Sequence, residues 1–266
     1  SWRFQINDSP LSFAHIAVAG GSVGSEPGAD VSADQLTLTA RAKAAFGEDV
    51  RLRAPQVSLD GESVLSFSGS TDVHIGDLTV SGGSTVTTVL GRALDLSLDN
   101  LTVSSGSRID VSVKGFPSMQ GPGAPQGSTS RMGASYGGVG YRNTATSTYG
   151  SADNPTDFGS GGSGPGGGAL ALTVSDTLTN NGTISVGGSS SASGGSILVH
   201  TRALVGSGTF SANGAGINTT SYLGPGAGGR IALYAETATS SFSGVVEAKG
   251  ACNMEYGYLW YCGGDG

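Results

Sequence analysis

The chain has 266 residues, of which 47 are glycine, while only 12% are charged and 7% are aromatic, and its net charge is -7. Scattered lysine and arginine exclude the basic stripe of a nucleic-acid-binding surface, and no apolar run approaches the roughly 18 residues of a membrane-spanning helix. Regular apolar pairs run through the sequence, so its pattern is not that of a disordered chain. Because it begins at Ser1 rather than Met, we expect a processed protein or a fragment of a larger one.

Apolar and polar residues alternate in short stretches through the first half of the chain. A two-residue period predicts β-strands, because successive side chains of a strand point to opposite faces. Each predicted strand is very short, with about two inward residues, and turn residues separate the strands. Only residues 40–47 look helical, and that stretch is too short to be stable alone. The strand stretches are 36–38, 50–52, 57–59, 73–75, 78–80, 94–96, 101–103 and 109–113.

Residues 115–168 interrupt this alternation with glycine, proline and serine. A structureless stretch of this length is unusual inside a compact domain. We interpret it as a long glycine-rich surface loop inserted into one continuous domain, and a linker between two short domains is the alternative. Its expected contacts with the domain surface are Phe116, Tyr136, Tyr141, Tyr149 and Phe158.

Alternation resumes after residue 168 in three units that begin at the glycine pairs of Gly166, Gly194 and Gly228. Each unit continues with an apolar triplet, a polar middle, a second triplet and another glycine, and the first half shows a looser repeat of similar length. A period of about 20–24 residues with two or three strands is typical of one coil of a parallel β-helix. The sequence therefore predicts a single all-β domain over residues 1–266, a parallel β-helix or β-solenoid, which crossover chirality makes right-handed.

Glycine clusters stand directly before apolar triplets at 166–168, 194–195 and 228–229. Coils of a solenoid stack about 4.8 Å apart, so backbones pass close to one another at the corners, where glycine tolerates sharp turns and close approach. The variable glycine and serine loops occupy the same phase of the repeat. We therefore expect them to cluster on one side of the molecule.

The two cysteines, Cys252 and Cys262, predict one local disulfide and hence an oxidising compartment, with two free thiols as the alternative. No histidine or further cysteine stands beside them, so we expect neither a zinc site nor another cofactor. Together with the aromatic stretch between them, they predict a disulfide-bonded cap over residues 251–266 that covers the last coil. The same stretch could instead receive a following domain or subunit.

Three acids, Asp95, Asp99 and Asp110, fall in neighbouring triplets and are the only weak candidates for catalytic residues. An enzyme that acts on polysaccharides needs two or three acids on one face, or an acid beside a base. Solvated acids on the outer face are the simpler interpretation, because nothing nearby supplies an aromatic platform for a sugar.

Four N-glycosylation sequons begin at Asn7, Asn100, Asn181 and Asn218 and favour a secreted glycoprotein. Threonine patches, among them Thr85, Thr87 and Thr88, resemble ice-binding faces. That function needs a long threonine row repeated in every coil, which the sequence does not show.

The three C-terminal units carry GGGALALTV, GGSILVH and GPGAGGRIALY, each followed by a second triplet and a glycine turn. These units resemble the glycine-rich parallel β-helix repeats of large secreted and cell-surface proteins, both adhesin-like proteins and components of flagellar-hair (mastigoneme) filaments. The resemblance covers residues 160–250 well and residues 30–114 loosely.

This resemblance implies an extracellular structural or adhesive module, such as a protomer of a surface filament, with no catalytic residues to transfer. Its partners would be other subunits or domains of the same assembly, or extracellular polysaccharide. Two alternatives stay open: a pectin-lyase-like lyase, hydrolase or epimerase, which rests on analogy of fold alone, and an ice-binding protein. We favour the non-enzymatic role.

Overall fold

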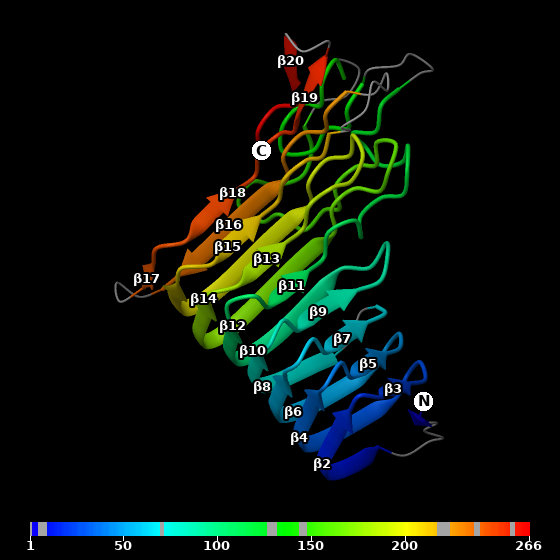
Figure 1. Cartoon of the computed structure of the whole chain (residues 1–266), viewed down its shortest axis with the longest axis vertical. Helices are drawn as coiled ribbons and strands as arrows, with labels where there is room; N and C mark the ends of the chain where they lie inside the picture. The colour runs from blue at the N-terminus through cyan, green and yellow to red at the C-terminus, as the bar shows by residue number, and fades with distance from the viewer. Residues whose placement is uncertain are drawn as a thin grey trace.

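The structure is a computed structural model that describes residues 2–4, 10–69, 72–126, 132–143, 148–216, 224–236, 240–255 and 259–266. It is an all-β solenoid of about eight turns, in which two sheets of parallel strands face each other across a common core (Figure 1). The predicted fold class is thereby confirmed as a parallel β-solenoid, while its right hand stays a prediction.

One sheet, which we call the long wall, is built from long strands. They are β2 (Leu11–Ala19), β4 (Asp30–Thr39), β6 (Arg51–Leu59), β8 (Asp72–Val80), β10 (Leu94–Val103), β12 (Ala169–Asn180), β14 (Ser196–Gly206) and β16 (Arg230–Ala235), with β17 (Ser241–Phe242) paired to β14.

The other sheet, the short wall, alternates with the long wall along the chain. Its strands are β1 (Trp2–Phe4), β3 (Ser22–Ser25), β5 (Lys43–Phe46), β7 (Val64–Phe67), β9 (Thr85–Thr88), β11 (Arg108–Asp110), β13 (Thr183–Ser185), β15 (Thr209–Ser211) and β18 (Val245–Glu247). Two further strands, β19 (Cys252–Glu255) and β20 (Leu259–Cys262), form a separate antiparallel hairpin.

The apolar triplets supply the core because parallel pairing places equivalent residues of successive coils above one another. One inward column of the long wall runs through Leu36, Val57, Leu78, Leu101, Leu178 and Leu204. These side chains are all buried, and each buried aliphatic side chain stabilises the fold by about 1.5–3 kcal/mol.

The prediction of very short strands is wrong for the long wall, where two triplets merge into one bent strand. In β8 the inward residues Val73 and Ile75 are followed by Leu78 and Val80, and the alternation changes phase at the buried Gly76. A Cβ atom at Gly76 would lie 2.4 Å from the carbonyl oxygen of Pro55 in the preceding coil. The strand therefore bends at a glycine instead of ending there.

The stretch at residues 40–47 that looked helical contains β5 instead. Ala44 and Phe46 alternate inward from this strand, which pairs with β3 and β7 on either side. Tertiary pairing decides the structure here, because a helix this short has little stability of its own.

The walls continue across the insertion at residues 115–168. β10 pairs directly with β12 in parallel, with Leu94 opposite Leu170 and Leu101 opposite Leu178. The chain thus leaves one coil, makes its excursion and resumes the next coil in parallel pairing with the one before the insertion.

The glycine-rich connections lie together on one side of the C-terminal coils, as the sequence predicts (Figure 1). Backbone hydrogen bonds join them from coil to coil, among them Gly194 N to Ala227 O at 3.0 Å and Gly228 N to Gly264 O at 3.0 Å. We call this body the glycine array. Its described parts are residues 115–126, 132–143, 148–168, 187–195, 212–216, 224–229, 248–251 and 263–266.

Hydrogen bonding in the glycine array differs from that of a strand. Three successive N–H groups, those of Ser193, Gly194 and Gly195, donate to three different neighbours, Ser160, Ala227 and Val186. A three-residue repeat of directions is typical of extended helices of the polyproline II type. A Cβ atom at Gly194 would lie 1.9 Å from the carbonyl oxygen of Ala212, so these segments approach one another too closely for a side chain.

Candidate functional site

The structure separates the three candidate acids. Asp95 and Asp99 lie on β10 of the long wall, whereas Asp110 ends β11 of the short wall. Asp99 and Asp110 each bond to the next coil. Asp99 accepts a hydrogen bond from Ser175 Oγ at 3.0 Å, and Asp110 accepts one from Ser185 Oγ at 3.0 Å. Both bonds link the coil before the insertion to the coil after it.

Asp95 has a different environment. Burial raises the pKa of its carboxyl above the usual value of 3.8. Its partner in register on β12 is Ala171, the start of an outward column that continues through Leu198 and Ala232. Leu198 and Ala232 are only 7% and 9% exposed although they point outward, so the wall is covered over β14 and β16, whereas Ala171 is half-buried and Asp95 lies in the exposed part of the column.

Residues 148–158 of the insertion supply hydrogen bonds that hold them against this wall. Tyr149 O accepts from Arg230 Nε at 3.0 Å, and Asp153 O accepts from Tyr234 Oη at 2.6 Å. Asp157 O accepts from Ser196 Oγ at 2.5 Å. The insertion therefore lies over the outer face of β14 and β16.

Two tyrosines form the centre of this contact. Tyr136, which is fully buried, packs its ring 4.6 Å from that of Tyr149 and lies beneath the guanidinium group of Arg230. Because Ser196 Oγ donates to Asp157 O, Tyr136 Oη donates to Ser196 Oγ, at 2.5 Å. Burial raises the pKa of both tyrosines. The cluster joins the glycine array to the long wall, and sequence reasoning identified its tyrosines only as surface contacts.

A shallow polar groove runs along the outer face of the long wall farther from the glycine array. It lies between two outward columns, one with Asp77, Asn100 and Thr177 and the other with Thr79, Thr102 and Thr179. Asn100 Nδ2 donates to Asp77 Oδ1 at 2.8 Å, and Asn100 Oδ1 accepts from Thr177 N at 3.2 Å. The amide of Asn100 thus ties β8, β10 and β12 together.

The sequons differ in their surroundings. Asn100 is half-buried in β10, whereas Asn181 is exposed in the connection from β12 to β13. Asn7 and Asn218 lie outside the described residues.

Cys252 and Cys262 are joined by a disulfide and face each other in the pairing of β19 with β20. The chain then returns through residues 263–266, whose backbone bonds to the glycine array: Gly264 N donates to Val139 O at 2.8 Å and Gly266 N to Ala248 O at 2.7 Å. The disulfide therefore closes a hairpin that is anchored at its C-terminal side.

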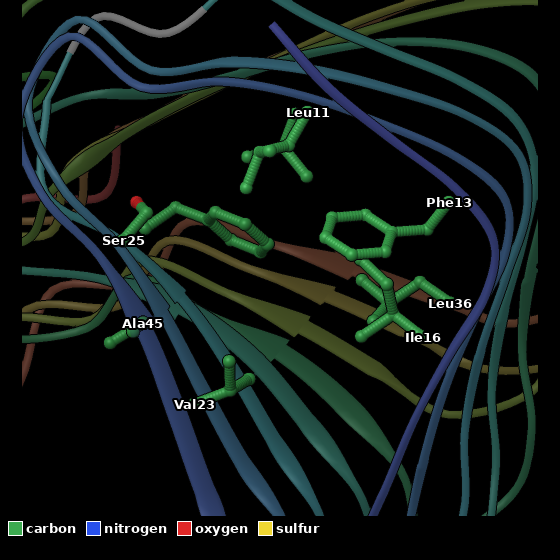
Figure 2. A pocket seen from close by; sticks show the side chains of 10 residues that line it. Leu11, Phe13, Ile16, Val23, Ser25, Leu36 and Ala45 are labelled. Atoms are coloured by element: carbon green, nitrogen blue, oxygen red, sulfur yellow. The ribbon is translucent and has the colours of Figure 1, made fainter. Parts of the chain in front are cut away.

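An apolar hollow opens at the N-terminal end of the solenoid, where Leu11, Phe13, Ile16 and Leu36 point toward one another (Figure 2). Its other lining residues are Val23, Gly24, Ser25, Val31, Ala45 and Phe46. All of these come from the first coils, and most of them continue the inward columns. The hollow is therefore the first layer of the core, and its lining carries no charged side chain.

Within the residues that the structure describes, no group of three or more His, Cys, Asp and Glu side chains could hold a metal ion. The described part of the chain has no helix that is long and apolar enough to cross a membrane. Comparison of the chain with protein-family models, with curated proteins and with solved structures found no match.

The expected threonine patches do not form one row. Thr85 and Thr87 lie on β9, where the residues opposite them on β11 are Arg108 and Asp110. Thr88 is buried and donates its hydroxyl to Phe67 O at 2.9 Å. Charged residues thus interrupt the outer face of the short wall.

Proposed function

We propose that this chain is an extracellular structural or adhesive module, a rigid wall segment of a larger surface assembly such as a filament. The observation that carries the proposal is the placement of the candidate acids. Asp95 and Asp99 belong to one wall and Asp110 to the other, while both walls continue by parallel pairing across the insertion. A polysaccharide-cleaving site needs its acids within several ångströms of the same bond, whereas a spacer needs a continuous hydrogen-bonded wall.

The disulfide between Cys252 and Cys262 supports the extracellular part of the proposal. Disulfides persist in oxidising environments and are rare in the cytosol. A hairpin closed by two exposed, disulfide-bonded cysteines suits a module that works outside the cell.

The ends of the walls supply surfaces for contacts with further subunits or domains. Among the described strands, β2 pairs only with β4 and β16 only with β14, so each leaves one edge of the long wall unpaired. Val245 and Val246 of β18 are 50% and 49% exposed at the C-terminal end. Exposed strand edges beside apolar side chains are surfaces on which other strands add.

The test has two parts, location and turnover. Immunogold labelling of cells that make the protein should place it at the cell surface, and the purified protein should release no product from polyuronides. Label confined to the cell interior would contradict the proposal. Turnover that is lost in Asp95→Asn would favour the enzyme instead, since burial raises the pKa of the Asp95 carboxyl.

A further inference from the structure

The two described sequons are not equivalent, and the difference lies in how each asparagine uses its amide. In β10, Asn100 Nδ2 donates a hydrogen bond to Asp77 Oδ1, and Asn100 Oδ1 accepts one from the backbone N–H of Thr177. A side-chain amide has two donor hydrogens on nitrogen and an acceptor oxygen. One of the two Nδ2 hydrogens of Asn100 is used in the 2.8 Å contact that joins β10 to β8, and a sugar in its place would break that contact.

The side-chain amide of Asn181 is instead held through its oxygen. Its Oδ1 accepts from the backbone N of Ser207 at 3.1 Å and from Ser207 Oγ at 3.4 Å, both in the next coil. Oxygen and nitrogen occupy opposite corners of the planar amide, so fixing Oδ1 against Ser207 turns Nδ2 away from that coil. Asn181 is exposed, and Thr183, the third residue of its sequon, is exposed at the start of β13.

We propose that Asn181 is an N-glycosylation site of the folded protein and that Asn100 is not. In the transfer, Asn181 Nδ2 forms a bond to the anomeric carbon of an oligosaccharide carried on a polyprenyl diphosphate. The bond from that carbon to the diphosphate oxygen breaks, polyprenyl diphosphate leaves, and Nδ2 gives one proton to a base of the transferase. The inference rests on the proposed extracellular location, because the reaction belongs to the secretory route.

The position of Asn181 has a consequence for assembly. It lies in the connection that leads from the long wall to the short wall, whereas the connections of the glycine array lead from the short wall back to the long wall. A glycan at Asn181 would keep the connection between β12 and β13 in solvent. The glycine array and the ends of the walls would stay free for contacts.

The test uses the full chain with a secretion signal, expressed in cultured insect cells. Ser9→Ala and Thr220→Ala remove the two sequons outside the described residues. An amidase that releases N-glycans converts the glycosylated asparagine to aspartate, and in ¹⁸O-labelled water it leaves a heavy oxygen at that residue. Mass spectrometry of cells and medium should find the label at Asn181 and not at Asn100.

Two matched variants keep both asparagines. Thr183→Ala should remove one glycan mass and Thr102→Ala none, with secretion unchanged in both, because each leaves the asparagine hydrogen bonds in place. An unlabelled Asn181, or a labelled Asn100 in secreted protein, would overturn the assignment. Label at Asn181 in a chain that the cells retain would support the assignment and count against the proposed location.

Discussion

At Gly194 and Gly229 the backbone leaves no room for even a methyl group. A Cβ atom would lie 1.9 Å from Ala212 O at the first position and 2.0 Å from Gly195 O at the second. Both contacts are to backbone atoms, which cannot rotate away as a side chain can. The segments of the glycine array can therefore pack this closely only because glycine has no side chain.

We expect Gly194→Ala to lower the free energy of unfolding by about 1–3 kcal/mol, the usual cost of overpacking. Gly24→Ala is the matched control, because a Cβ atom there would lie 3.5 Å from Ala45 O, an ordinary contact. Urea unfolding followed by circular dichroism measures both variants. Equal midpoints for the two would contradict the close packing of the array.

Asp95 makes stability depend on pH in a defined direction. Because burial raises its pKa in the folded state above 3.8, the folded protein binds this proton more tightly than the unfolded chain does. Its effect is absent at pH values below 3.8 and becomes destabilising as the pH rises through the raised pKa.

Asp95→Asn should therefore be more stable than the unchanged protein at neutral pH and equally stable near pH 3. Thermal midpoints measured across this range test the prediction. Asp99→Asn serves as the control, since it keeps an oxygen acceptor for Ser175 Oγ and should change the midpoint little. A stabilisation by Asp95→Asn that is the same at both pH values would count against burial as the cause.

At the scale of elements, the bond network of Asn100 repairs an irregularity in the long wall. The pairing of β10 with β12 shifts register between Leu98 and Leu101, and within that shift Asn100 Oδ1 accepts the backbone N–H of Thr177. A side chain thus supplies an acceptor where the ladder is interrupted.

Asn100→Leu should cost about 1–3 kcal/mol of stability, because it leaves the Thr177 N–H without its side-chain acceptor and removes the donor to Asp77. Thr102→Ala, two residues along β10 in the same groove, should change stability by no more than about 0.5 kcal/mol. Denaturant titration distinguishes the two. If the variants are equally stable, the amide has no bridging role.

The strands of the two walls can be predicted from the sequence, whereas the packing of the glycine array cannot. Triplets such as 101–103 predict inward residues because a two-residue period is a local property. The bend at Gly76 depends on its contact with Pro55 in another coil. In the glycine array, the acceptors of many N–H groups lie on segments that are distant in the sequence. No local pattern encodes either contact.

For the candidate acids too, the sequence predicts the local orientation of the side chains but not their position in the fold. The alternation around Asp95 and Asp110 predicts that both acids point outward, which is how both lie. The connection at residues 104–107 turns the chain from the long wall to the short wall between them. Whether two such acids share a face depends on the position of that corner, which alternation of polar and apolar residues does not reveal.

At the scale of the whole molecule, the described wall strands of each coil pair only with those of the coils directly before and after it, so that the stability of the walls is nearly a sum of local terms. The hairpin β19–β20 forms its own sheet and reaches the rest of the molecule through residues 248–251 and 263–266. Disturbing the hairpin should therefore loosen the C-terminal end and leave the distant coils unchanged.

We expect a Cys252→Ser, Cys262→Ser double variant to lose at most about 3 kcal/mol, the loop-closure value for a ring of this size, and to lose it locally. Hydrogen exchange should accelerate at residues 248–266 and at the array segments bonded to them, 226–229 and 137–139, while β4, β6 and β8 exchange as before. A reductant added to the unchanged protein should reproduce this pattern and have no effect on the variant. Faster exchange throughout β4–β8 would instead mean that the coils unfold as one cooperative unit, against the nearest-neighbour pairing of the two walls.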